Sequence, residues 1–419
     1  MKKNFFILIY IFLIILIQLS PKSICDDIEY NDSVDVSAEI TSSCTTSQSE
    51  IKIPETNSRA CVVINRNSNT ILYGKNENTK RKMASTTKIM TAIIIIENYN
   101  LDETVEVSKK AAGTGGSRLG LKTGDKITIR DLLYGLMLCS GNDAAVALAE
   151  YAGSNIEGFA ELMNKKANDL GLKDTHFETP HGLDADEHYT TAYELATLSN
   201  YALNNTTFAQ IVGTKNYTVT INGYPKQLSN TNELLGNLDG VYGIKTGFTN
   251  GANRCLVTAC KRNNMDIICV VLGADTKKFR TSDSIKLINY VFDNFEIVNI
   301  QELINEKFGN WKESYLTKFV INKGISQEIT LKLENLEYPC IPIRKDLISN
   351  LTESINCKTY LEAPVYENIE IGNIELISES KTIANCKIYT ESKINKKSTY
   401  SYLIYFFKNF PYILQNNLI

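Results

Sequence analysis

The sequence contains a hydroxyl and an amine placed to act on each other. Ser85 and Lys88 lie three positions apart in Ser85-Thr86-Thr87-Lys88, at the start of an apolar run. On a helix, residues i and i+3 share a face, so Lys88 is within reach of the Ser85 hydroxyl. The positive end of the helix dipole favours negative charge that develops near Ser85. Because a partly desolvated lysine acts as a base, the pair is predicted to be a nucleophile with its base.

A second hydroxyl follows at Ser140-Gly141-Asn142, where a helical pattern breaks. Side chains at such a break project into a cleft. We expect Ser140 to relay a proton between the lysine and a leaving group. The Asn142 amide has two possible roles, which are to hold a peptide carbonyl or to orient the lysine.

The third stretch is Lys245-Thr246-Gly247, followed by Phe248, in the middle of a predicted strand. A glycine in a strand lets a ligand backbone approach closely. A substrate strand can then pair along this edge. Lys245 and Thr246 offer donors to a carboxylate.

Two of these motifs occur a second time in the sequence, and we assign no catalytic role to the second copies. Ser378-Glu379-Ser380-Lys381 repeats the spacing of Ser85 and Lys88, but it lies in a segment of alternating strand pattern. Lys122-Thr123-Gly124 repeats the third stretch, but it precedes Ser140 and lies in a turn-rich loop beside Asp125. The order and placement of the three stretches therefore carry the prediction.

The elements around these residues indicate an α+β fold. Residues 58–75 predict two short strands, and residues 129–153 predict two helices with a break at 140–142. The run from Ser85 to Tyr99 contains four consecutive isoleucines and also fits a buried strand. Its length, and a Ser or Thr able to cap its start, favour a buried helix. Residues 241–275 predict an antiparallel meander.

The termini indicate export. Two lysines precede an apolar run from Phe5 to Leu19, which predicts a signal peptide over residues 1–25, with an uncleaved anchor as the alternative. Residues 26–54 form an acidic, Ser- and Thr-rich linker. The catalytic domain is predicted over residues 55–296.

The C-terminal part of the sequence has a different pattern of apolar and polar residues. Residues 297–392 alternate apolar and polar positions and predict a small all-β domain without strong helical segments. Residues 393–419 combine lysines with aromatic residues and are too interrupted to span a bilayer. We expect this tail to lie on an anionic membrane surface, with a poorly ordered or domain-packed terminus as the alternative.

Global composition excludes one class of partner. The formal net charge is -3 and the pI about 5.9, so no basic excess indicates a nucleic-acid partner. The 10 cysteines are scattered singly. We therefore expect mostly buried free thiols rather than a disulfide framework.

Two other candidate sites are weaker. His176, His181 and His188 cluster with Asp184 and Asp186, but in a turn-rich segment, so no metal is expected. Cys139 precedes Ser140 and is expected to be a packed neighbour rather than a nucleophile, since no histidine lies near it in sequence.

The three motifs, in this order, are the signature of the penicillin-recognising serine enzymes. The surrounding segments "ASTTKIMTA", "LLYGLMLCSGNDAAVALAE" and "GVYGIKTGFTNGA" closely resemble the low-molecular-mass D-alanyl-D-alanine carboxypeptidases, serine peptidase family S11. The resemblance covers about residues 55–295. It implies a serine β-lactamase/transpeptidase-like catalytic domain, no cofactor, peptidoglycan stem peptides as substrate and β-lactams as acylating inhibitors.

The resemblance also implies roles for individual residues. Ser85 would be the acyl-ester nucleophile, Lys88 its base and Ser140 the relay, with Asn142 on the substrate amide. The terminal carboxylate would lie on Lys245 and Thr246 of the Lys245-Thr246-Gly247 motif. The backbone N–H groups of Ser85 and Phe248 would form the oxyanion hole. Arg280 would help to bind the carboxylate.

Other functions are compatible with the same three motifs. A class A β-lactamase shares the three motifs but needs an extra glutamate in a context absent downstream of Ser140. A D,D-endopeptidase or transpeptidase differs only in the acceptor of the acyl group. A non-catalytic wall-binding or β-lactam-sensing module is disfavoured because every chemical residue is present. The expected location is the outer face of the cytoplasmic membrane or the cell wall.

Overall fold

The computed structural model describes residues 36–37 and 51–416, and side chains up to Lys408 with the exception of Tyr405. The predicted signal peptide and most of the linker lie outside the described residues. The chain divides into two compact units, Met1–Asp293 and Asn294–Ile419.

The N-terminal unit contains one five-stranded antiparallel sheet of order β2-β1-β9-β8-β7. Its strands come from both ends of the unit: β1 (Ala60–Asn65), β2 (Ile71–Lys75), β7 (Val241–Thr249), β8 (Asn253–Arg262) and β9 (Met265–Ala274). The predicted strand pair and meander are thus confirmed. Strand β7 stands at one edge of the sheet.

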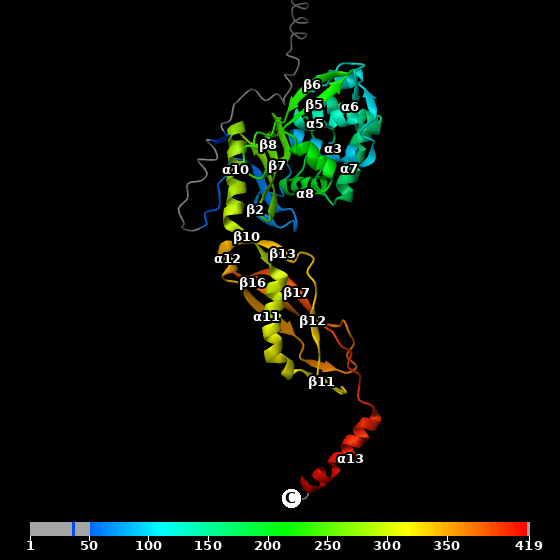
Figure 1. Ribbon diagram of the computed structural model, residues 1–419, viewed down its shortest axis with the longest axis vertical. Coiled ribbons are helices and arrows are strands. Elements are labelled where there is room, and N and C mark those ends of the chain that lie inside the picture. The colour runs from blue at the N-terminus through cyan, green and yellow to red at the C-terminus, as the bar shows by residue number, and fades with distance from the viewer. Residues whose placement is uncertain (1–35, 38–50, 417–419) are drawn as a thin grey trace, which may run out of the picture. The chain divides into compact units, whose positions relative to one another are not determined.

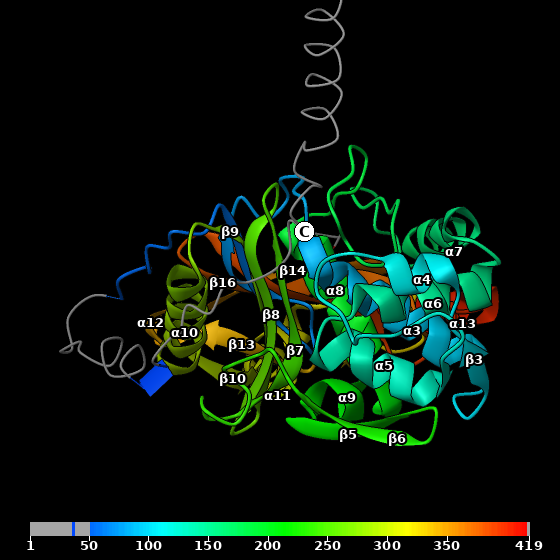
Figure 2. The same cartoon turned by 90° about the horizontal axis from the view of Figure 1, so that it is seen from above.

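Helices cover both faces of this sheet. Figure 2 shows α10 (Lys277–Asn294) on one side and the helical cluster on the other. The cluster consists of α3 (Lys88–Asn98), α4 (Lys109–Gly113), α5 (Ile129–Leu138), α6 (Asn142–Gly153), α7 (Ile156–Asp169), α8 (Ala192–Leu203) and α9 (Thr206–Gly213). The predicted α+β class is confirmed.

Helix α3 forms the centre of the cluster (Figure 1). Residues Lys88 to Ile95 are all buried, and α3 packs against five other helices. An apolar residue on every side of a helix requires such a position. The four isoleucines are therefore helical, and they hold the first turn of α3 rigidly in the domain interior.

Two small hairpins complete the unit. Strands β3 (Thr104–Glu106) and β4 (Lys126–Thr128) form one, and β5 (Asn216–Ile221) and β6 (Tyr224–Ser229) form the other. Asn222 and Gly223, both at positive φ, make the two-residue turn of the second hairpin, for which Asn-Gly is a favoured sequence.

The C-terminal unit has a four-stranded antiparallel sheet of order β12-β17-β16-β14. The strands are β12 (Leu331–Leu333), β14 (Thr352–Cys357), β16 (Glu370–Ser378) and β17 (Lys381–Thr390). Two-stranded sheets are formed by β10 (Phe295–Asn299) with β13 (Cys340–Arg344), and by β11 (Val320–Asn322) with β15 (Tyr360–Glu362). Short helical segments lie at η2 (Leu316–Lys318) and α12 (Lys345–Ile348), and α13 (Thr399–Asn416) ends the described chain.

The prediction of an all-β domain without strong helices needs a correction. Helix α11 (Ile300–Tyr315) runs for 16 residues and is capped by Asn299, whose side chain accepts from the Glu302 N–H. Its buried residues Ile300, Ile304 and Phe308 recur every four positions, which is a helical period. The helical period at the start of this region was overlooked, because the segments that follow it alternate as strands do.

Candidate active site

Ser85 and Lys88 meet as predicted. Ser85 lies in a 3-10 turn, η1 (Ala84–Thr87), and Lys88 begins α3. The Lys88 Nζ is 2.7 Å from the Ser85 Oγ. Lys88 is fully buried and Ser85 is 5% exposed. The amine and the hydroxyl are therefore fixed in contact, with little access for bulk water.

The predicted Ser or Thr cap at this helix start is wrong. Neither η1 nor α3 has a side-chain cap. The hydroxyls of Thr86 and Thr87 instead donate back to the carbonyls of Met83 and Ala84, at 2.6 and 2.8 Å. Ala84 has a φ of 50°, a conformation that non-glycine residues rarely adopt. The turn presenting Ser85 is thus held by threonine hydroxyls in a strained backbone, as functional sites often are.

Lys88 contacts two further acceptors besides Ser85. Its Nζ donates to the Asn142 Oδ1 at 2.7 Å and to the His181 carbonyl at 2.8 Å. Three oxygen atoms around one amine fix both its position and its orientation. This geometry holds the Nζ toward the Ser85 hydroxyl.

Asn142 connects Lys88 to a neighbouring loop. Its Nδ2 donates to the Gly115 carbonyl at 2.9 Å, and its own N–H donates to the Ser117 carbonyl at 2.8 Å. Of the two roles that the sequence left open for Asn142, the structure therefore shows the contact with the lysine. Its role toward a substrate amide stays a prediction.

Asp143 stabilises that loop and was missed by the sequence analysis. Its buried carboxylate accepts from the N–H groups of Leu119, Gly120 and Leu121 at 2.7–2.9 Å. A buried carboxylate requires such donors. Its position directly after Asn142 was the only available signal.

Ser140 lies at the break between α5 and α6, as predicted. It is 6% exposed and has a φ of 61°. This left-handed residue turns the chain so that Asn142 starts α6 beside Lys88. Cys139 donates to the Gly135 carbonyl at 3.1 Å, and burial raises the pKa of its thiol to about 11. A thiol with this pKa stays protonated near neutral pH, in agreement with a packed neighbour rather than a nucleophile.

The Lys245-Thr246-Gly247 motif lies on the edge strand β7, which packs against η1. Lys245 and Thr246 are almost fully buried. The Thr246 hydroxyl lies 2.8 Å from the Thr231 hydroxyl. The motif and the turn that carries Ser85 are thus neighbours in space, although Lys245 follows Ser85 by 160 positions in the sequence.

Gly247 faces the turn that carries Ser85. A Cβ added there would lie 3.1 Å from the Ser85 nitrogen and 3.2 Å from the Met83 carbonyl oxygen. The sequence analysis expected the missing side chain to admit a ligand backbone. The close neighbour in the structure is the chain's own backbone at Ser85. Phe248 follows, and its ring packs under the Arg254 guanidinium at 3.8 Å.

Arg280 lies on α10 and is fully buried. Its guanidinium forms an ion pair with Glu233, which also accepts from the Thr281 hydroxyl at 2.7 Å. Burial alone raises the pKa of Glu233, but Arg280 and Thr281 lower it below its usual value. The sequence analysis did not single out Glu233, because the acid becomes informative only once α10 brings Arg280 to it.

The histidine segment also packs against the turn that carries Ser85. The His188 Nδ1 accepts from the Glu178 N–H at 3.0 Å, so the Nε2 carries the hydrogen and faces the Thr87 hydroxyl at 2.7 Å. Gly182 has a φ of 89°, and a Cβ there would lie 1.9 Å from the Ala84 carbonyl oxygen. Among the residues that the structure describes, no three metal-ligating side chains are grouped. Of the three imidazoles, that of His188 contacts the turn around Ser85, through the Thr87 hydroxyl.

The free energy of unfolding is expected to fall in mild acid, because two of these histidines are buried. Burial, then nearby cations, lowers the pKa of both His181 and His188 to about 3. In the unfolded chain the two imidazoles become protonated near pH 6.5, whereas in the folded chain they become protonated only near pH 3. Each histidine therefore removes up to ~1.4 kcal/mol of folding free energy per pH unit between about pH 6.5 and 3. Stability is retained above this window.

Denaturant unfolding of wild type and His188→Gln between pH 7.5 and 4.5 measures this effect. Glutamine can still accept and donate but does not titrate, so the variant should lose stability less steeply as the pH falls. His176→Gln is the control, because His176 is only partly buried. Equal slopes for wild type and His188→Gln would contradict the prediction.

Comparison with known proteins agrees with this geometry. Residues 45–276 match a family model described as D-alanyl-D-alanine carboxypeptidase. The D-alanyl-D-alanine carboxypeptidase DacF of Bacillus subtilis is 31% identical over 352 residues, which cover 82% of this chain and 88% of the relative.

Solved structures extend the similarity to the fold. The D-alanyl-D-alanine carboxypeptidase DacD of Francisella tularensis superposes with a TM-score of 0.66 at 25% identity, covering 84% of this chain and 98% of that one. A Streptomyces DD-transpeptidase superposes with a TM-score of 0.56 at 37% identity, covering 58% of this chain and 99% of that one. The chain therefore belongs to the D-alanyl-D-alanine carboxypeptidase family of serine peptidases.

Proposed function

We propose that this D-alanyl-D-alanine carboxypeptidase removes the terminal D-alanine from peptidoglycan stem pentapeptides through an acyl-ester on Ser85. The carrying observation is the contact of the buried Lys88 with both Ser85 and Asn142, beside the edge strand β7. A nucleophile in contact with a positioned base is the arrangement that acyl transfer requires.

In this reaction, Lys88 Nζ takes the proton from Ser85 Oγ as the oxygen attacks the carbonyl carbon of the D-Ala–D-Ala bond. The oxyanion lies between the N–H groups of Ser85 and Phe248. The proximity of Gly247 to the Ser85 nitrogen supports this pairing of the two elements. Ser140 passes the proton to the departing amine of D-alanine. Water then attacks the ester, and Ser85 recovers its proton.

The substrate is proposed to extend along β7. An edge strand offers backbone groups to a ligand that pairs as an added strand. Lys245 and Thr246 bind the terminal carboxylate, and Gly247 keeps the strand close to Ser85. Arg280, whose guanidinium is paired with Glu233, is proposed to help bind the same carboxylate.

Digestion of a free D-Ala–D-Ala pentapeptide, with analysis of the products, tests this function. Release of one D-alanine and labelling by a fluorescent penicillin are the expected results. No release and no label from folded protein would contradict the proposal. Labelling followed by rapid hydrolysis of the antibiotic would instead support the β-lactamase alternative.

Transpeptidation is the second candidate, because the chain is 37% identical to a Streptomyces DD-transpeptidase. Water and an amine compete for the same acyl-enzyme. Repeating the digestion with an added amine acceptor separates the two activities, since transfer gives an amide product in place of the tetrapeptide acid.

We further propose an exported protein that acts at the outer face of the cytoplasmic membrane or in the cell wall, with no nucleic-acid partner. The apolar N-terminal segment and the net charge of -3 support this location and this exclusion. In the described part of the chain, every helix is too short or too polar to cross a membrane.

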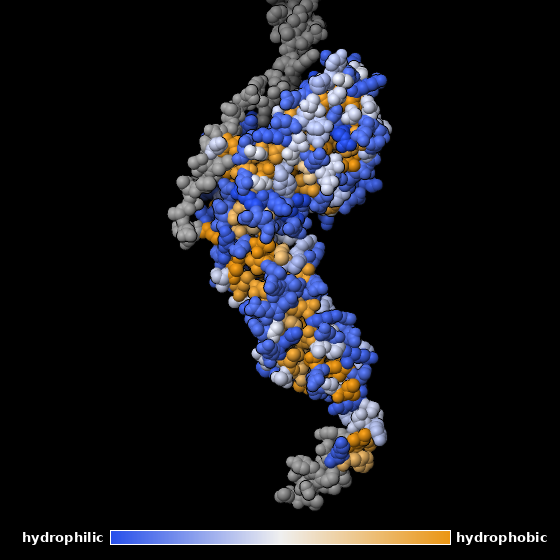
Figure 3. All heavy atoms as spheres, viewed as in Figure 1, coloured by the Kyte–Doolittle hydropathy of each residue, from blue (hydrophilic) through white to orange (hydrophobic). Residues whose placement is uncertain are grey.

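Helix α13 is proposed to bind the membrane surface. Its side chains Leu403, Phe406 and Phe407 are between 47 and 69% exposed, and Figure 3 shows apolar residues at the surface there. Lysines 393, 396, 397 and 408 lie in and before it, with no acid after Glu391. Exposed apolar side chains with nearby lysines favour an interface with anionic lipid.

The full chain is therefore expected to co-sediment with vesicles that contain anionic lipid, and less with neutral ones. The double variant Phe406→Ser, Phe407→Ser should weaken this binding by roughly tenfold or more, since each phenylalanine buries apolar area in the interface. Replacing the exposed Tyr338 and Tyr360 with serine is the matched control. Equal binding by both double variants would show that α13 is not the contact.

A further inference from the structure

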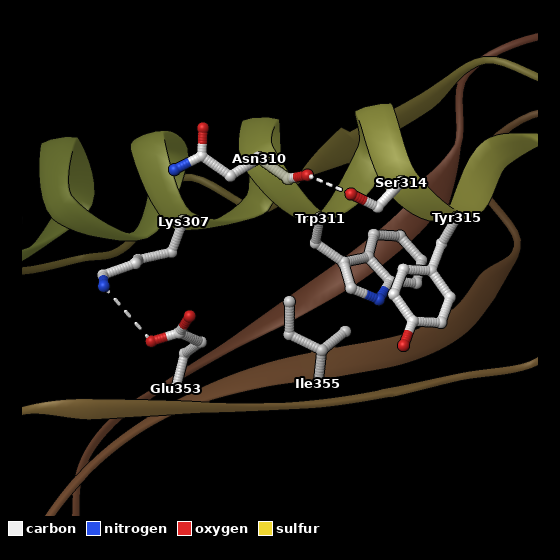
Figure 4. Close-up of a pocket in the computed structure, with 7 residues that line it drawn as sticks. All are labelled: Lys307, Asn310, Trp311, Ser314, Tyr315, Glu353 and Ile355. Atoms are coloured by element: carbon white, nitrogen blue, oxygen red, sulfur yellow. Dashed lines mark hydrogen bonds and ion pairs between the residues drawn. The ribbon is translucent and has the colours of Figure 1, made fainter.

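A groove in the C-terminal unit lies between α11 and the edge strand β14 (Figure 4). Its volume is about 440 Å³. Trp311 and Tyr315 extend into it from the helix, and Ile355 faces them from the strand. None of the predicted catalytic residues belongs to this unit, so the groove is separate from the site described above.

One end of the groove is aromatic and rigid. The rings of Trp311 and Tyr315 are nearly parallel, with centroids 5.5 Å apart and planes inclined by 11°. Behind them, Trp311 packs on Phe308 at 5.7 Å and against the edge of Phe319 at 6.3 Å. Three neighbouring rings hold the indole in one orientation. This surface is therefore ordered before any ligand arrives, which lowers the cost of binding.

The other end is polar and carries both signs of charge. The Lys307 Nζ lies 3.3 Å from the Glu353 Oε2, with the side chains 32% and 40% exposed. An ion pair this exposed adds little to folding stability. Its donors and acceptor are accessible to a ligand in the groove. Because the charges balance, they suit a neutral ligand with many hydrogen-bonding groups better than an ion.

We propose that this groove binds an N-acetylated sugar of the peptidoglycan glycan. A sugar ring has an apolar face of C–H groups, which stacks on Trp311 and Tyr315, and a rim of hydroxyls that reaches Lys307 and Glu353. The methyl of the acetamido group would pack against the Ile355 side chain. A purely apolar ligand would make no hydrogen bond with Lys307 or Glu353. A charged ligand would compete with one of these two residues for the other.

The inference rests on the proposed function, since the stem peptide is carried on this glycan. A second contact on the same polymer raises the local concentration of stem peptides around the enzyme without changing the chemistry at Ser85. It would favour polymer over free peptide as substrate.

The intrinsic fluorescence of the full chain provides a direct measurement. Trp311 is the single tryptophan of the 419 residues, so its emission reports on this groove alone. Titration with β-1,4-linked oligomers of N-acetylglucosamine is expected to give a saturable change. Cello-oligosaccharides of equal length lack the acetamido group and should bind at least about tenfold more weakly.

Matched variants locate the contact. Glu353→Gln and Tyr315→Ala should each weaken binding by about tenfold or more. Glu362→Gln removes a carboxylate from a similar exposed ion pair, with Lys323 at 2.7 Å, and Tyr360→Ala removes an exposed ring on the same strand. Both controls lie outside the groove and should bind as wild type does.

Several outcomes would overturn the proposal. These are no saturable change up to roughly 10 mM oligomer, equal binding of the cello-oligosaccharide, or equal losses in the variants and their controls. A change of Trp311 emission with free stem peptide alone would assign the groove to peptide. The free pentapeptide digestion separates this test from that of the function, because it contains no sugar and needs no groove.

Discussion

Replacement of Ser85 by alanine is expected to abolish both penicillin labelling and D-alanine release, with a loss of roughly 10⁴-fold or more in kcat. The acyl-enzyme cannot form without the Oγ that lies against the Lys88 Nζ. Ser85 is small and nearly buried, so alanine fits its place and the fold should persist. Gel fluorescence after labelling and the pentapeptide digestion measure the two losses.

The chain offers a matched control for this experiment. Ser378 and Lys381 repeat the same spacing, but they are paired across the tight turn between β16 and β17. The Ser378 hydroxyl is used there to bind the Leu347 carbonyl at 3.2 Å. Ser378→Ala should therefore label as wild type does. A label that survives in Ser85→Ala would mean that another serine is the nucleophile.

Replacement of Lys88 by methionine is expected to slow acylation by about 10²- to 10⁴-fold, the usual contribution of a general base. Methionine keeps most of the length of the side chain while removing the amine that touches Ser85. Stopped-flow or quenched measurements of acylation by a penicillin give the rate. Ser85 remains present, so slow residual labelling distinguishes this variant from Ser85→Ala.

The same substitution has a structural cost that must be measured beside the rate. The Asn142 Oδ1 and the His181 carbonyl lose their donor in the protein interior, at ~1–3 kcal/mol for each group left unsatisfied. Thermal unfolding should therefore show a lower midpoint with a single cooperative transition. Lys381→Met is the control for both readouts. Acylation at the wild-type rate in Lys88→Met would remove Lys88 from the mechanism.

Most of the secondary structure follows from local patterns. The meander from β7 to β9 and the break at Ser140 follow from a few neighbouring residues, because turns and periodicity act over short distances. The helix over the isoleucines was predicted from the length of the run, since its periodicity alone also fits a strand. Helix α11 shows the limit of this reasoning. Its period-four pattern was present, but it was overlooked within a region of strands.

Capping at Ser85 shows a different limit. Serine and threonine at a helix start usually cap it, yet here the hydroxyls of Thr86 and Thr87 stabilise a strained turn and leave the Ser85 hydroxyl to Lys88. Gly182 and Gly247 lie so close to this turn that a Cβ on either would press against its backbone. Tertiary contacts thus overrode a local preference at the functional position, where such departures are expected.

The sequence by itself determined the family and the α+β class, and it predicted the residues that carry the chemistry, because these depend on residue types and spacing within short motifs. Only the tertiary structure decided what each of them touches. That Asn142 holds Lys88, that Asp143 holds the loop behind Asn142, that Glu233 pairs with Arg280 and that Gly247 faces Ser85 all depend on long-range packing. Such contacts join segments tens to more than a hundred residues apart, and no local pattern encodes which segments meet.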